Sequence, residues 1–158
     1  MRRKVFIMVI FAFTFTMILS VISMQESIKT IDVFYKDKKP SLKTLEKTKI
    51  ILGKHEDEYK ISYYVITDSL NMDLIKKYNL PDTHFPFAVV INGKYSARIN
   101  NNKIDFVHFP LFMKGIGRHE GNWSLDDLEI VLKENTLLLD KNILPELEHE
   151  EDDTPCDE

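Results

Sequence analysis

Apolar and polar residues alternate along this chain in blocks that predict both strands and helices. Two runs rich in β-branched and aromatic residues, 31–35 and 61–67, predict strands, the second of them buried at the centre of a sheet. A continuous apolar run over 87–91, then Asn-Gly at 92–93, then an alternating run over 94–99 predict a β-hairpin. Asn-Gly favours this turn because both residues accept the positive φ angles that a two-residue connection requires.

Three further segments carry apolar residues at helical spacing. They cover residues 41–54, 70–78 and 124–135; Ser41 can cap the first, and a capping box opens the third. Residues 104–109 predict one more strand of the meander. The resulting order, β-α-β-α-β-β-(insert)-α, predicts a mixed sheet with helices on both faces, in which the first two strands are parallel.

The two ends of the chain differ from the single domain, residues 24–139, that its length and 44% hydrophobic content predict. A basic start followed by an apolar run over 5–22 predicts either a signal peptide cleaved after Ser23 or an uncleaved membrane anchor, residues 1–23. We therefore expect the rest of the chain to be extracytoplasmic, periplasmic or secreted, with membrane contact only through 5–22. Residues 140–158 hold nine acidic residues and one basic residue, which predicts a disordered acidic tail.

The composition bears on two properties of the protein, disulfide bonding and nucleic-acid binding. Cys156 is the one cysteine of the chain, so an intrachain disulfide cannot form and stability must come from the core. The sequence has no basic stripe with interleaved aromatic residues, so nucleic acid is not an expected partner.

The order and spacing of these elements resemble the thioredoxin family over about residues 29–137. The resemblance is carried by Tyr-Asn-Leu at 78–80, by Pro86 before an apolar strand, and by the Asn-Gly turn at 92–93. It implies an α/β, thioredoxin-like three-layer sandwich with a mixed four- to five-stranded sheet and helices on both faces. It also implies that Pro86 corresponds to the family's cis-proline, although this chain inserts two residues before it.

The chain departs from that family at the active site. Where the family carries Cys-x-x-Cys, this sequence has Lys-Lys-Pro-Ser at 38–41. The proline of the motif is retained if one residue is deleted from the preceding loop, whereas an alignment without a gap places Lys39 at the first cysteine. Neither alignment places a cysteine at the site. The family's buried acid falls at Val33, which cannot transfer a proton. Thiol–disulfide exchange needs a thiolate, so we expect no such activity, no catalytic residue and no cofactor.

The resemblance then implies a redox-inactive module of the cell envelope that binds a protein or an extended peptide. A cis X-Pro bond is a costly feature, and in this fold it turns the preceding backbone outward, where a peptide can pair with it. The predicted binding residues are those of the degenerate active-site position and the proline loop: Lys38, Lys39, Pro40, Ser41, Phe85 and Pro86.

Histidines on the same scaffold give an alternative prediction. His84 precedes Pro86 by two residues, and His108 and His119 flank an extra segment at about residues 100–123. If that segment folds over the site, these three imidazoles and Met113 suit copper or zinc. The spacing matches no metal-ligand motif, so ordinary surface histidines are the competing interpretation.

Residues 104–123 are too apolar and aromatic for an idle loop, and their three glycines disfavour a helix. We expect this segment to pack as a lid on the sheet edge near Pro86. Its polar candidates for contact with a ligand are Arg118, His119 and Glu120; the alternative is that these residues only hold the lid in place.

Overall fold

The computed structural model describes residues 28–81, 85–111 and 119–142. Several predictions concern residues outside these ranges: the signal peptide or anchor over 1–23, His84, Met113, Arg118, Cys156 and most of the acidic tail. Within the described ranges, no helix is both long enough and apolar enough to cross a membrane.

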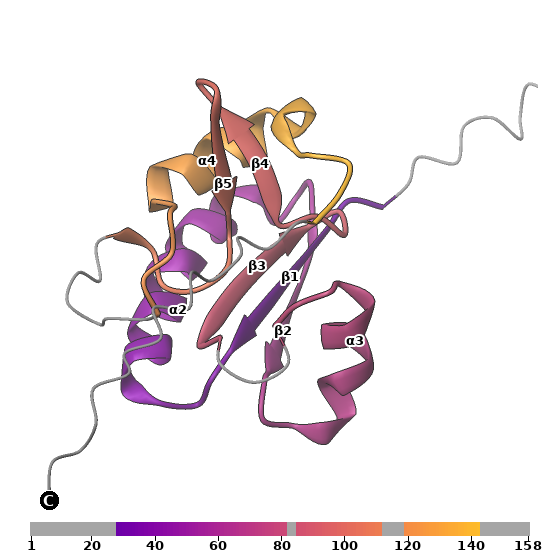
Figure 1. Ribbon diagram of the computed structural model, residues 1–158, viewed down its shortest axis with the longest axis vertical. Helices are drawn as coiled ribbons and strands as arrows, with labels where there is room; N and C mark the ends of the chain where they lie inside the picture. Colours follow the sequence, from indigo (N-terminus) through magenta and orange to yellow (C-terminus); the bar gives the residue numbers. More distant parts are fainter. Residues whose placement is uncertain (1–27, 82–84, 112–118, 143–158) are drawn as a thin grey trace, which may run out of the picture.

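Within these ranges the fold is mixed α/β, with a three-stranded sheet, a two-stranded sheet, three α-helices and short 3₁₀ turns (Figure 1). In chain order the strands and helices are β1 (Thr30–Tyr35), α2 (Lys39–Leu52), β2 (Lys60–Val65), α3 (Met72–Lys77), β3 (Phe87–Ile91), β4 (Ser96–Ile99), β5 (Asn102–Asp105) and α4 (Leu125–Lys133).

The larger sheet has the strand order β2-β1-β3. Strands β1 and β2 are parallel, with Val33 opposite Tyr63, as the sequence predicted, and β3 runs antiparallel to β1. The prediction that 61–67 forms a buried central strand was wrong. β1 is central, whereas β2 pairs with β1 alone and keeps its side chains partly exposed.

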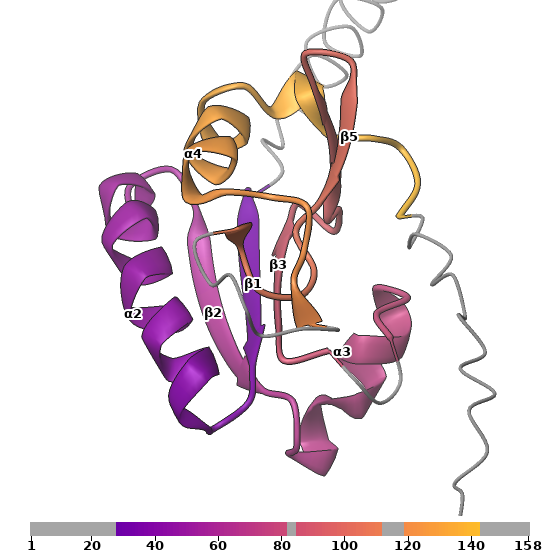
Figure 2. The same cartoon turned by 60° about the vertical axis from the view of Figure 1, so that its left-hand side comes forward.

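The Asn-Gly turn forms as predicted, but the long hairpin does not. Asn92 and Gly93 have φ angles of 51° and 79°, and Ile91 and Lys94 exchange backbone hydrogen bonds of 2.7 and 2.9 Å. Beyond Lys94 the chain leaves β3, and β4 pairs with β5 in a separate sheet that projects past the end of β3 (Figures 1 and 2). The predicted four- to five-stranded sheet is therefore divided in two.

The free edge of β3 is occupied instead by the residues that follow β5. The amide of Val89 donates to the carbonyl of Phe106 at 2.9 Å, and the amide of His108 donates to the carbonyl of Phe87 at 2.8 Å. Only one segment can occupy this edge, and placing 106–108 there buries Phe106 completely. This burial is a physical reason for the division of the sheet.

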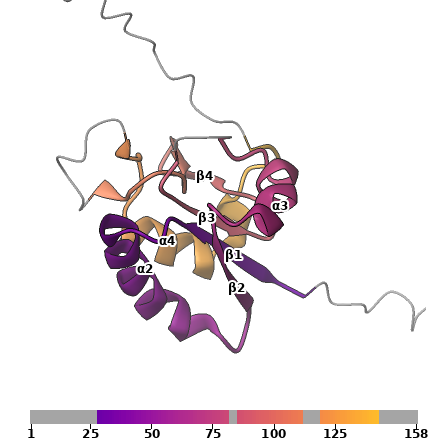
Figure 3. The ribbon, with the colours of Figure 1, turned by 90° about the horizontal axis from the view of Figure 1, so that it is seen from below.

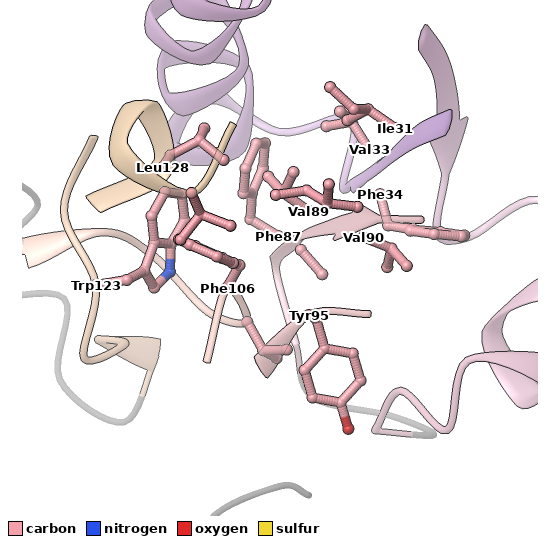
Figure 4. Close-up of a cluster of buried hydrophobic side chains, with 14 of the residues drawn as sticks. Ile31, Val33, Phe34, Phe87, Val89, Val90, Tyr95, Phe106, Trp123 and Leu128 are labelled. Atoms are coloured by element: carbon pink, nitrogen blue, oxygen red, sulfur yellow. The ribbon is translucent and has the colours of Figure 1, made fainter. Parts of the chain in front are cut away.

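Helices cover both faces of the larger sheet, as predicted: α2 and α4 lie on one face and α3 on the other (Figures 1 and 3). Large aromatic residues fill the core between α4 and β3 (Figure 4). The indole of Trp123 stacks on Phe87 with a centroid distance of 6.3 Å and meets Phe106 edge-on at 5.5 Å. Leu128 on α4 is fully buried beside them.

The two predicted helix caps had different outcomes. Ser124 and Asp127 form the predicted capping box of α4: the amide of Asp127 donates to Ser124 Oγ at 3.1 Å, and the amide of Ser124 donates to Asp127 Oδ2 at 2.7 Å. Ser41 does not cap α2, because Pro40 is accommodated in the first turn and the helix begins earlier, with extended Lys38 at the N-cap position.

Candidate functional site

The start of α2 and the segment around Pro86 lie side by side. Ser41 Oγ donates a hydrogen bond of 3.0 Å to the carbonyl oxygen of Pro86, and the amide of Lys36 donates to the same oxygen at 3.1 Å. Ser41 and Phe85 are buried, whereas Lys38, Lys39 and Pro40 are exposed. The structure thus brings together the two halves of the predicted binding site. We call residues 36–41 together with Pro86 the α2 entrance.

Pro86 is not a cis-proline. None of the peptide bonds within the described residues is cis, so the bond between Phe85 and Pro86 is trans and the predicted cis ledge was wrong. The trans form of an X-Pro bond is intrinsically favoured by about 0.5–1 kcal/mol. In this form, the Pro86 carbonyl points toward α2 and accepts hydrogen bonds from the Lys36 amide and from Ser41 Oγ. That carbonyl is therefore not open to pairing with a peptide.

The α2 entrance carries three basic side chains, Lys36, Lys38 and Lys39, and one exposed acidic side chain, Asp37. Lys38 and Lys39 project from it, and no acidic side chain lies in the first turn of α2. None of the described side chains caps this helix end. The helix dipole adds positive potential to that of the lysines. Such a surface attracts carboxylates and other anions.

The same site lacks a catalytic nucleophile in the described residues. Its hydroxyl, Ser41 Oγ, is buried and already donates to the Pro86 carbonyl. An activated serine instead donates to an adjacent general base. The arrangement suits binding better than covalent chemistry.

A buried acid lies one residue before the expected position. Asp32, in the middle of β1, is 7% exposed and accepts a 2.5 Å hydrogen bond from the Tyr78 hydroxyl. Burial and then this hydrogen bond raise the pKa of Tyr78 above its ordinary value. Because adjacent strand residues face opposite sides of a sheet, Asp32 lies on the α3 face and Val33 on the α2 face. Sequence reasoning missed this pair; an aspartate inside an apolar strand was the available signal.

Two of the three candidate metal ligands come together. The rings of His108 and His119 lie with their centroids 6.3 Å apart and their planes at 27°. Burial lowers the pKa of His108 below its ordinary value, and the nearby His119 lowers it further. His84 lies outside the described ranges.

The segment predicted as a lid packs on the edge of the sheet. Val107 bridges Ala88 of β3, and Phe106, Phe109 and Trp123 are buried. These aromatic residues belong to the core, so the described part of the segment is structural. Of its polar candidates, Glu120 is exposed, His119 is half-buried, and Arg118 is outside the described ranges.

Comparisons with protein-family models, with curated proteins and with solved structures find no match to this chain.

Proposed function

We propose that this chain is an exported, redox-inactive, thioredoxin-like module that binds an acidic, extended segment of a protein partner at the α2 entrance. The observation that carries the proposal is the hydrogen bond from Ser41 to Pro86. It joins the proline segment to a helix start that has two exposed lysines and no sulfur.

Topology supports the thioredoxin-like part of this proposal. The order β-α-β-α-β, with β1 parallel to β2 and antiparallel to β3, agrees with what the resemblance implies. The antiparallel bridge from Ala88 to Val107 supplies a fourth position at the sheet edge, and α4 follows it. The hairpin of β4 and β5 is then an insertion before that position.

Charge supports the choice of an acidic partner. Lys38 and Lys39 are exposed at a helix N-terminus, where the helix dipole already favours negative charge. An extended peptide with spaced carboxylates can reach both lysines. Because the site is exposed, this attraction weakens as the salt concentration rises.

Peptide binding tests the proposal directly. Fluorescence anisotropy of the full chain in detergent would compare labelled decapeptides that are acidic, neutral or basic. We expect preference for the acidic peptide, and at least about tenfold weaker binding, or about 1.4 kcal/mol, for the variant K38A/K39A. The variant K60A/K76A loses the same charge from exposed positions elsewhere and is the matched control. Equal binding by both variants, or no acidic preference, would overturn the proposed site.

The redox part has its own test. In an insulin reduction assay with dithiothreitol, the full chain should not exceed the background rate, because the domain supplies no thiolate. The Cys156→Ser variant controls for the single thiol near the C-terminus. A rate above background that persists in this variant would contradict the proposal.

A further inference from the structure

His108 and His119 each hold a nitrogen that lacks a hydrogen-bond partner. Their Nδ1 atoms are shielded from solvent and unpaired within the described residues. A buried polar atom without a partner is costly, and native structures satisfy most of them with protein, water or an ion. Two such nitrogens on facing rings point to one shared ligand.

The backbone holds the two histidines firmly in this relation. The amide of His108 donates to Phe87 of β3, and its carbonyl accepts from the indole Nε1 of Trp123 at 3.3 Å. The carbonyl of His119 accepts from the amide of Phe109 at 2.8 Å. The backbone of each histidine is therefore hydrogen-bonded to buried residues of the core.

The backbone of His108 has a left-handed conformation. Its φ angle is +68°, in the left-handed region that non-glycine residues seldom occupy. Such strained positions cluster at ligand sites because the surrounding structure must enforce them. The His108 ring lies next to the His119 ring, with their centroids 6.3 Å apart.

We propose that His108 and His119 together bind one transition-metal ion of the Cu²⁺, Ni²⁺ or Zn²⁺ class. Imidazole nitrogen is a preferred ligand for these metals, and Cu²⁺ binds such ligands most tightly in the divalent series. With metal–nitrogen bonds of about 2.0–2.1 Å, two imidazoles on opposite sides of one ion have ring centres about 6 Å apart, and at a tetrahedral angle about 5 Å. The observed 6.3 Å lies at the upper end of this span, so the rings must turn and approach each other to share an ion.

The two imidazoles are the only described protein ligands in this proposal. The described residues contain no group of three or more histidine, cysteine or acidic side chains that could hold a metal. Solvent therefore completes the coordination shell in this proposal.

The test is competition for Cu²⁺ and Zn²⁺ between the full chain, stripped of metal with a chelator, and a chromophoric chelator. We expect one ion per chain to bind, and His119→Ala to weaken this binding at least about 100-fold, because even outer-shell changes cost 10- to 100-fold. His108→Asn should do the same while preserving the left-handed backbone, which asparagine tolerates. Thermal unfolding without metal would verify that both variants fold.

The acidic tail is a competing site, since His149 lies among its carboxylates. His149→Ala is therefore the control, and we expect it to retain the single tight site. With Cu²⁺, electron paramagnetic resonance should show two nitrogen ligands in the wild type and in this control. Loss of the site in His149→Ala, or its retention in the folded variant H108N/H119A, would overturn the proposal.

Discussion

Replacing Tyr78 with Phe removes one hydroxyl from the α3 face of the sheet and nothing else. That hydroxyl donates a 2.5 Å hydrogen bond to the carboxyl group of Asp32, which is 7% exposed. The ring itself should stay in place, because its edge-on contact with Phe34, at 6.0 Å between centroids, does not involve the oxygen.

The expected loss follows from the kind of bond that is broken. A hydrogen bond to a charged group contributes about 1.5–3 kcal/mol to stability, and a buried carboxyl group that loses its donor falls in that range. For a chain of this length, the loss corresponds to a Tm lower by about 5–10 °C. A double-mutant cycle with Asp32→Asn should give a coupling energy of at least about 1 kcal/mol between the two side chains.

Tyr64→Phe is the matched control. Tyr64 also packs on Phe34, at 5.2 Å, but its hydroxyl has no hydrogen-bond partner among the described residues. Its loss should change stability by no more than about 0.5 kcal/mol. Urea unfolding monitored by circular dichroism would measure both variants. If Tyr78→Phe were no more destabilising than Tyr64→Phe, the Asp32–Tyr78 bond would not contribute to stability as argued here.

Two further predictions concern Tyr95 and Gly121. Burial, followed by the charge of Asp105, raises the pKa of Tyr95 from 10.0 to about 12, so the unfolded chain releases this proton at lower pH than the folded chain. The contribution of Tyr95 to stability should be constant below about pH 10 and fall as pH rises toward 12, so the fall in stability over this range should be smaller in Tyr95→Phe; an equal fall would contradict this cause. A Cβ atom at Gly121 would lie 2.5 Å from the carbonyl oxygen of Val107, so Gly121→Ala should destabilise by about 1–3 kcal/mol in urea unfolding. Gly53→Ala, whose Cβ would meet nothing closer than 3.9 Å, should be nearly neutral, and similar losses in both variants would refute the steric argument.

Features set by neighbouring residues were predictable from the sequence. The capping box at Ser124 and the turn at Asn92 formed as predicted, because each depends on residues at most three positions apart. The parallel pairing of 31–35 with 61–67 followed from the helix between them, which imposes a crossover.

Features set by competition between distant segments were not predictable in the same way. The apolar run of β2 fits a central or an edge strand equally well, and only the whole sheet decides between them. Residues 94–99 and 106–108 could each have occupied the free edge of β3, and the choice depends on which one lets Phe106 and Trp123 enter the core. The trans bond at Pro86 was likewise not predictable from the local resemblance, which implied the cis form.

For the candidate sites, too, some contacts were predictable from the sequence and others were not. The sequence placed Ser41 next to Pro86 and grouped His108 with His119, through the order of the elements and the position of the extra segment. It did not reveal the bond from Tyr78 to Asp32, because an aspartate inside an apolar strand marks one partner, but nothing in the sequence identifies Tyr78, 46 positions away, as the other.

The extra segment illustrates how a structural and a functional role can share a few residues. Phe106 and Trp123 are fully buried, so the chain on either side of residues 112–118 cannot lift away from the sheet without exposing the core. A lid that opens is therefore incompatible with the described part of this segment.

The same packing fixes the backbone at His108 and His119. A metal site with two protein ligands requires a fixed backbone, because no further described ligand would correct a misplaced ring. If the metal proposal holds, the aromatic residues next to the two histidines act as positioning residues. Trp123→Phe, which removes the hydrogen bond to the His108 carbonyl, should then weaken metal binding more than it weakens the fold.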